Sequence, residues 1–289
     1  MKQFVKPTAV VVLLALVLIM GGEMAVRLIP DNDVYTFKYN YLEKHPDAVK
    51  TLLMGHSQIA YGVNPSLIGD SVFNMAISGR VIYFDMELLR HFLPKMHNLQ
   101  SVVLPMHYTF SGFNDFYEFK ASFNTCCFHY FKDMHIRHPD YNGFYRKSYF
   151  SYRFLKSNEP CVEDEKGFKK ITRVYTKRGT STDKTQRQSR KDEFRTLLCE
   201  VARLCHSYGV RLIVVSTPCA NDYVAQTRPE GMETLQGVAD SIRRLYPIEY
   251  HNYINDESFR NDSLYSDESH LNHIGAEQFS LRLKADFGL

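Results

Sequence analysis

Tryptophan is absent from this chain of 289 residues, and no two of its six cysteines form a C-x-x-C pair. The second absence removes the usual sequence signal for a structural zinc site or a dithiol redox site. We expect most of the cysteines to be small buried hydrophobes, and a disulfide stays open if the domain is exported. An excess of charge is also lacking. The net charge of +3 and the pI of about 8.4 give no indication of nucleic-acid binding.

Hydrophobic residues make up 44% of the chain and charged residues 23%, which is the balance of a globular protein. The length suits one large α/β domain with a sizeable core, and no internal repeat is present. We predict a signal anchor at 1–28, a polar and aromatic connector at 29–48, and a single domain at 49–289.

The N-terminal end carries a mostly apolar run, Pro7–Gly22, behind Lys2 and Lys6. A helix continuing through Val26 could cross a bilayer, with the lysines on the cytoplasmic side and the domain outside. We therefore predict a single-pass helix in the bacterial inner (cytoplasmic) membrane, with the domain facing the periplasm. A cleaved signal peptide is the rival interpretation, although no Ala-x-Ala site follows. A buried core helix is a third.

Short apolar runs alternate with segments of helical periodicity over the remainder of the chain. The predicted strands cover 51–54, 71–76, 101–106, 210–216 and 247–253, and the predicted helices begin at 58 and cover 83–93, 190–208, 232–245 and 274–287. This β-α-β alternation predicts a parallel sheet with right-handed crossovers.

Residues 107–190 interrupt the alternation, because they hold many Tyr, Phe and His but few aliphatic side chains. We predict an insertion of short helices and loops over the carboxyl edge of the sheet, with a flexible polar loop at 176–189. The aromatic side chains could line a sugar-binding cleft or form a satellite hydrophobic cluster, and both interpretations stay open.

Ser57 lies in the stretch Thr51–Val63, where an apolar run ends at Gly55 and a helix can begin at Gln58. The pattern predicts a buried strand, a tight turn and a helix N-terminus. A serine in this turn lies at the carboxyl end of a strand, where open α/β sheets bind their ligands. Free amides at a helix N-terminus would also stabilise an oxyanion. An ordinary serine N-cap would have the same pattern.

Three short motifs occur in a telling order: Gly55-His56-Ser57, then Asn74-Met75-Ala76-Ile77-Ser78-Gly79, and finally Asp267-Glu268-Ser269-His270 ahead of the last predicted helix. In this order they resemble blocks of the SGNH (GDSL-type) hydrolase superfamily, over roughly residues 49–289. The resemblance implies a three-layer α/β/α fold with a parallel, flavodoxin-like sheet.

The resemblance also implies roles for individual residues. A serine hydroxyl needs a base and an orienting acid to act as a nucleophile at neutral pH. Ser57 would be the nucleophile, His270 its base, and Asp267 the residue that holds the tautomer of His270. The backbone amides of Ser57 and Gly79 would form the oxyanion hole.

The chain departs from the family at its third block, Gly-x-Asn-Asp. The expected place, just after the third strand, reads Pro105-Met106-His107-Tyr108, whereas Gly112-Phe113-Asn114-Asp115 comes several residues later. Either Asn114 supplies a further oxyanion donor, or the match is chance and another group such as His107 fills in. In this departure the chain resembles membrane-anchored relatives within the superfamily, namely the alginate O-acetylation proteins and the D-alanyl-transfer protein of teichoic acid synthesis. Those act beside a multi-span membrane acyltransferase.

A metal site is the competing interpretation of the same histidines. Asp267, His270 and His273 stand at three-residue steps, and His135 and His138 form another pair. Because 266–272 is predicted to be a loop, the first three ligands need not converge. We therefore predict no metal and no cofactor.

Together with the predicted anchor, the resemblance implies a serine-dependent esterase or O-acyltransferase, acting on acyl groups of a cell-envelope glycan through an acyl-serine intermediate. Its partners would be the glycan or acyl-donor substrate and a multi-span membrane acyltransferase, without nucleic acid. The alternative is a non-catalytic carbohydrate-binding or scaffold subunit of an envelope polysaccharide-modification complex. The distance between Ser57 Oγ and a ring nitrogen of His270 separates the two hypotheses.

Overall fold

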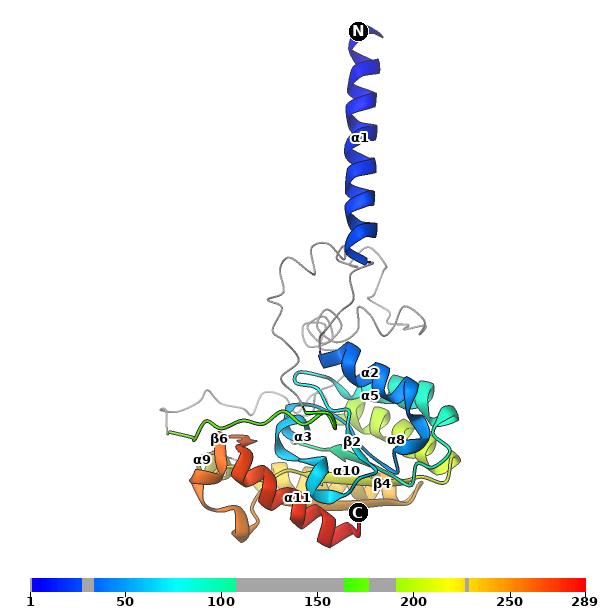
Figure 1. Ribbon diagram of the computed structural model, residues 1–289. Helices are drawn as coiled ribbons and strands as arrows, with labels where there is room; N and C mark the ends of the chain where they lie inside the picture. Colours follow the sequence, from blue (N-terminus) through cyan, green and yellow to red (C-terminus); the bar gives the residue numbers. More distant parts are fainter. Residues whose placement is uncertain (1, 28–33, 108–163, 177–190, 227–228) are drawn as a thin grey trace.

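A computed structural model describes residues 2–27, 34–107, 164–176, 191–226 and 229–289. Asn114, His135 and His138, most of the predicted insertion, and nearly all of the predicted polar loop lie outside these ranges. Within them, strands alternate with helices along the chain (Figure 1). The strands are β1 (Thr51–Leu53), β2 (Val72–Asn74), β3 (Ser101–Pro105), β4 (Arg211–Ser216), β5 (Ile248–Asn252), β6 (Tyr265–Asp267) and β7 (His270–Leu271). The α-helices are α1 (Lys2–Arg27), α2 (Val34–Lys44), α3 (Ser57–Gly62), α4 (Pro65–Ile68), α5 (Ile82–Phe92), α8 (Lys191–Ser207), α9 (Asn221–Gln226), α10 (Pro229–Arg243) and α11 (His273–Phe287).

The central sheet has five strands in the order β2-β1-β3-β4-β5, and every neighbouring pair is parallel. The predicted parallel α/β sheet is confirmed, and its order is flavodoxin-like. The sheet is buried on both faces, so its strands are nearly continuous apolar runs.

Two hydrophobic layers follow from the two-residue period of a strand. Leu52 and Val102 face one core, which they share with apolar residues of α5, α8 and α10. Their neighbours Leu53 and Val103 face the other core, which is closed by residues of α3, α4 and α11. Helices therefore cover both faces of the sheet and give the three-layer α/β/α arrangement.

The N-terminal helix α1 stands apart from the sheet in Figure 1 and exposes its large apolar side chains between Val10 and Met24. Across the part of the chain that the structure describes, no helix combines the length and the apolar character that crossing a bilayer requires. The signal anchor at 1–28 stays a prediction.

The helix α2 occupies part of the segment predicted as a connector, and it packs tightly on the domain. Leu42 is fully buried, and the ring of Tyr41 stacks on Phe73 of β2 with 4.2 Å between centroids. Lys38 on the same helix is also fully buried. This part of the chain is thus tied to the sheet by side chains that do not follow a simple amphipathic pattern.

The segment 164–176 runs along the side of the domain that holds β2, α3 and β6. The Asn74 amide donates to the carbonyl of Lys166 at 2.9 Å, which pairs the outer edge of β2 with this segment. Further along, the Tyr175 amide donates to the Tyr265 carbonyl at 2.8 Å. The segment thereby links an edge of the sheet to the β6–β7 hairpin.

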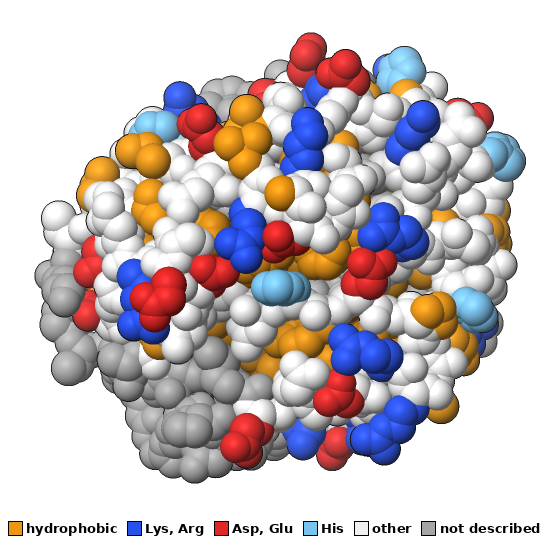
Figure 2. Space-filling model, turned by 90° about the horizontal axis from the view of Figure 1, so that it is seen from below, with side chains coloured by type: hydrophobic (Ala, Val, Ile, Leu, Met, Phe, Trp, Pro, Cys, Tyr) orange, Lys and Arg blue, Asp and Glu red, His pale blue; other side chains and the backbone are white. Residues whose placement is uncertain are grey.

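Figure 2 shows the molecule from below relative to Figure 1, and on this face positive and negative side chains are interspersed around a band of apolar side chains. Among the described residues, oppositely charged side chains pair near the surface, as in Arg211–Glu249 at 2.9 Å and Arg282–Asp286 at 2.7 Å. Mixed charge of this kind gives little long-range attraction for a polyanion from this side.

Candidate active site

The nucleophile turn connects β1 to α3 and places Ser57 at the first residue of the helix. Gly55 adopts a φ of +104°, and a Cβ there would lie 2.2 Å from the Pro105 side chain of β3. Only glycine tolerates both the left-handed backbone and the close approach. The Ser57 amide lies in the first helical turn, where backbone N–H groups have no acceptor within the helix.

The base is carried by a short antiparallel hairpin, β6–β7, where the sequence predicted a loop. The Asp267 carboxylate accepts the amides of Ser269 and His270, each at 3.0 Å, and His270 Nδ1 at 2.8 Å. Buried Asn272 then caps α11 by accepting the amides of Ile274 and Gly275. The two-residue length of β7 explains why no alternating pattern marked it as a strand.

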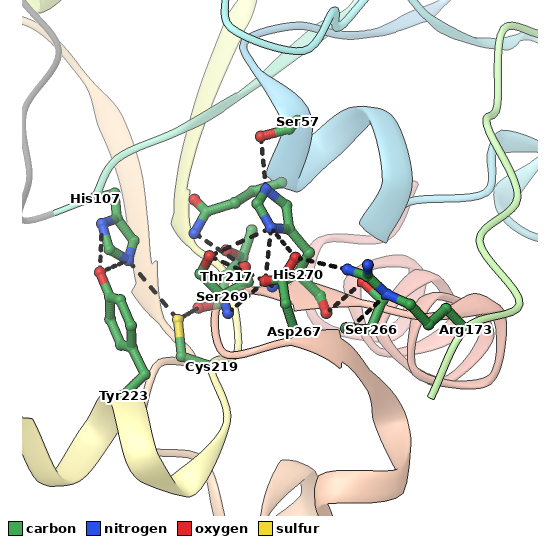
Figure 3. Close-up of polar contacts among 11 residues, drawn as sticks. Ser57, His107, Arg173, Thr217, Cys219, Tyr223, Ser266, Asp267, Ser269 and His270 are labelled. Atoms are coloured by element: carbon green, nitrogen blue, oxygen red, sulfur yellow. Dashed lines mark hydrogen bonds and ion pairs between the residues drawn. The ribbon is translucent and has the colours of Figure 1, made fainter. Parts of the chain in front are cut away.

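The two halves meet at the carboxyl edge of the sheet, as Figure 3 shows. His270 Nε2 lies 2.7 Å from Ser57 Oγ, while its Nδ1 faces Asp267. A second contact joins the same elements, since Gln58 Nε2 donates to the carbonyl of Ser269 at 3.3 Å. The structure thus brings Ser57, His270 and Asp267 into one hydrogen-bonded chain.

The charge on Asp267 is stabilised by its surroundings. Burial would raise the pKa of the Asp267 carboxyl. The hydrogen bond from His270, the positive charge on that ring and the hydrogen bond from the Ser269 amide together lower this pKa to about 2. Arg173 adds a cation, with Nη2 3.6 Å from Asp267 Oδ2 (Figure 3). Asp267 is therefore ionised at neutral pH and holds Nδ1 of His270 as the protonated nitrogen, which leaves Nε2 to accept from Ser57.

The second predicted oxyanion donor, Gly79, lies in the loop Met75–Arg80 between β2 and α5, with a φ of +75°. This loop is bound to the nucleophile turn, because the Ile77 amide donates to the Gly55 carbonyl at 3.0 Å. The third candidate, Asn114, lies outside the described residues.

His107, the substitute donor considered from the sequence, is buried just after β3. The hydroxyl of Tyr223 lies 2.6 Å from its Nε2, and Cys219 Sγ lies 3.7 Å from the same nitrogen (Figure 3). The structure therefore places this ring in the interior of the domain. The sequence could not show that β3 ends beside the loop after β4 and so buries the ring.

A buried ion pair lies directly behind the nucleophile turn. Arg80 Nη2 is 2.7 Å from Asp85 Oδ1, and both side chains are 2% exposed. The same carboxylate oxygen accepts the Gly55 amide at 3.0 Å. Burial raises the pKa of Asp85, whereas the Arg80 charge and the Gly55 amide lower it. A sequence without its fold gives no sign of this network, because its members pair across secondary-structure elements.

His56 stays neutral beside the triad. Burial, together with the charges of His270 and Arg80, lowers its pKa to about 4. It therefore adds no positive charge that would oppose the proton taken up by His270.

His273, the third ligand in the metal interpretation, contacts a backbone carbonyl instead. His273 begins α11, and its Nδ1 lies 3.3 Å from the Ile171 carbonyl. Among the described residues, no group of three His, Cys, Asp or Glu side chains is placed to hold a metal ion.

Comparison with known proteins gives only loose matches. No protein-family model and no curated protein matches the chain. A Streptococcus pneumoniae structure, provisionally named a platelet activating factor, is 13% identical, with 96% of this chain and 98% of that one covered and a TM-score of 0.47. A GDSL-like lipase from Bacteroides thetaiotaomicron is also 13% identical, with 88% and 100% covered and a TM-score of 0.41.

An acetyl xylan esterase, AlAXEase, is 13% identical as well, with 82% of this chain and 99% of that chain covered and a TM-score of 0.43. All three TM-scores lie below 0.5, so these overlaps carry no argument about activity. The likeness to the SGNH hydrolases continues to rest on the three motifs and on the geometry that joins them.

Proposed function

We propose that this protein is a serine-dependent esterase or O-acyltransferase that works through an acyl-serine intermediate. The observation that carries the proposal is the chain of contacts from Ser57 Oγ through His270 to Asp267, with distances of 2.7 and 2.8 Å. A hydroxyl, an imidazole and a carboxylate in this order form the arrangement that activates a serine.

In the first half-reaction, Ser57 Oγ attacks the carbonyl carbon of the acyl ester, and His270 Nε2 takes the hydroxyl proton. The oxyanion of the tetrahedral intermediate would be held by the amides of Ser57 and Gly79. When the intermediate collapses, His270 returns the proton to the departing alkoxide. The acyl group then remains as an ester on Ser57.

In the second half-reaction, an acceptor hydroxyl gives its proton to His270 and attacks the acyl-serine. Collapse of that intermediate returns the proton to Ser57 and restores the free enzyme. Water as the acceptor makes the protein an esterase, and a sugar hydroxyl makes it a transferase. We propose that the acyl groups are those of a cell-envelope glycan, as in the O-acetylation and D-alanyl-transfer proteins that its sequence resembles.

The proposal includes a location and a partner. Exposed apolar side chains along α1, behind Lys2 and Lys6, support a single-pass anchor in the bacterial cytoplasmic membrane with the α/β domain outside. A multi-span membrane acyltransferase would supply or receive the acyl group there. The alternative of a non-catalytic carbohydrate-binding or scaffold subunit is disfavoured, because such a role does not require His270 to be aimed at Ser57.

Hydrolysis of p-nitrophenyl acetate by the wild type, Ser57→Ala and Ser66→Ala tests the proposal. Ser66 is an exposed serine on nearby α4 and serves as the matched control. We expect Ser57→Ala to lose about 10³-fold or more in kcat, and Ser66→Ala to keep wild-type activity. If an oligosaccharide is added as acceptor, the formation of its acetylated product would identify transfer. Equal rates for wild type and a folded Ser57→Ala would refute the proposal.

A further inference from the structure

The loop that carries Gly79 is held from behind by two buried cations. Lys38 Nζ donates to the Ala76 carbonyl at 2.6 Å, and Arg80 Nη2 donates to the neighbouring Met75 carbonyl at 2.8 Å. On its other side the loop reaches the nucleophile turn, because the Ile77 amide donates to the Gly55 carbonyl. Successive peptide groups of the loop are therefore fixed in direction by contacts on both sides.

Lys38 comes from α2, outside the βα units that form the sheet, and its side chain is fully buried. Gly167, at a φ of +83°, seals it on one side, because a Cβ there would lie 3.2 Å from Lys38 Cε and 2.2 Å from the Asn74 carbonyl oxygen. Burying an ammonium group costs several kcal/mol before its partners compensate. An apolar side chain would fill the same space without that penalty, but it could not donate to the Ala76 carbonyl.

The charge of Lys38 lies where it can act on the loop that carries Gly79. A cation bound to a loop carbonyl orients the peptide dipole, and it adds positive potential behind amides that face a developing negative charge. In a water-poor interior such a fixed charge acts more strongly than it would in solvent. Lys38 thus combines a geometric and an electrostatic effect on the loop that carries the predicted oxyanion donor Gly79.

We propose that Lys38 is a positioning residue for the oxyanion loop, acting through the hydrogen bond from its side chain to the Ala76 carbonyl. This inference rests on the proposed acyl-serine chemistry. Removing the Lys38 ammonium group would release the Ala76 carbonyl and leave the loop less firmly held.

Kinetics of the full-length chain with p-nitrophenyl acetate test the inference, using Lys38→Met and the control Leu42→Ala. Leu42 lies one turn further along α2 and is equally buried, but it belongs to the hydrophobic core beside the sheet. We expect Lys38→Met to lower kcat about 10- to 100-fold with KM within about threefold, as for the loss of oxyanion stabilisation. Leu42→Ala should lower the unfolding temperature and keep kcat within about twofold.

Two further variants keep the test decisive if Lys38→Met does not fold. Lys38→Arg preserves the charge and a donor, whereas Lys38→Gln preserves only a neutral donor, so we expect kcat to fall further in Lys38→Gln. Wild-type kcat in folded Lys38→Met, equal kcat in Lys38→Arg and Lys38→Gln, or an equal fall in Leu42→Ala would overturn the inference. A wild type no faster than Ser57→Ala would instead refute the proposed function itself.

Discussion

The two sides of the active site are built in different ways. On the base side, Asp267 and His270 are three residues apart, and the contacts that orient the ring come mainly from the same hairpin. On the nucleophile side, the turn at Gly55 and the loop at Gly79 are held by Asp85 of α5 and Lys38 of α2. One side is a local structure, and the other is assembled from distant parts of the chain.

The two sides also differ in their contact with solvent. The side chains of Asp267 and His270 are 37% and 24% exposed, whereas those of Arg80 and Asp85 are 2% exposed each. Solvent partly screens the charges of Asp267 and His270, and a substrate can reach these exposed side chains. The charges behind the nucleophile turn are unscreened, so removing either partner leaves the other buried and unpaired. We therefore expect mutations on the base side to affect chemistry, and mutations on the other side to affect stability as well.

The largest effect is expected for Asp267→Asn. The amide would favour the wrong tautomer of His270 while keeping the shape of the turn, so kcat should fall by about 10³- to 10⁴-fold. Steady-state kinetics and thermal unfolding measure both consequences, and the unfolding temperature should stay within a few degrees of wild type. Asp240→Asn, at an exposed carboxylate on α10, is the control. A loss of less than tenfold would show that the hairpin does not control the base.

Arg80→Met tests the buried side of the comparison. Because it leaves the Asp85 carboxylate buried without its cation, we expect the free energy of unfolding to fall by about 3–5 kcal/mol. Urea unfolding measures this change. Pairing the substitution with Asp85→Leu should recover part of the loss, since the unpaired charge is removed. If Arg80→Met lost less than 1 kcal/mol, the pair would not be the support that its burial indicates.

His56→Gln isolates a titration on the nucleophile side. Folding lowers the pKa of His56 from about 6.5 to about 4, so between these values the unfolded chain binds a proton that the folded protein excludes. The neutral histidine therefore costs no stability above pH 6.5, and stability falls as the pH drops towards 4. Between pH 7.5 and pH 5, wild type should lose about 1 kcal/mol more than His56→Gln, after allowance for partial solvent contact.

Urea unfolding of wild type and His56→Gln at pH 7.5 and pH 5 measures this difference in the loss of stability. An equal acid loss in the two proteins would mean that His56 titrates normally, and that the nucleophile turn is more open to water than its packing indicates. His97→Gln serves as the control, because the His97 side chain is 75% exposed.

The smallest effect is expected for Arg211→Ala, far from both sides of the site. Its pair with Glu249 is nearly half exposed on both partners, so its removal should change the free energy of unfolding by less than about 1 kcal/mol. Urea unfolding beside Arg80→Met gives the direct contrast between an exposed and a buried pair. Similar losses in the two variants would remove the distinction on which the comparison rests.

Much of the fold could be predicted because its signals are local. The apolar runs at β3 and β4 and the helical stripe of α8 are long enough to show their period. Ser57 and the Asp267–His270 motif could also be found, because their spacing is short and characteristic. The proximity of the two was implied by the resemblance to the SGNH hydrolases, and it is the β6–β7 hairpin outside the parallel sheet that brings His270 to Ser57.

The remaining features could not be predicted, because they depend on contacts between distant segments. A lysine in a polar helix is usually exposed, and nothing near Lys38 in the sequence announces its burial against the loop after β2. The pairing of Arg80 with Asp85 depends on the conformation of the turn before α5, which the sequence does not show. The hairpin β6–β7 was too short for a periodic pattern, and His107 is buried only because β3 and the loop after β4 converge.

Covalent labelling with a fluorophosphonate, read out by peptide mass spectrometry, tests the central claim most directly. A serine activated by His270 should attack the phosphorus and carry one adduct on the peptide that contains Ser57. We predict this adduct in the wild type, its absence in Ser57→Ala, and labelling at least about 100-fold slower in His270→Ala. A folded wild-type protein without an adduct on Ser57, or one labelled equally fast without His270, would contradict the account.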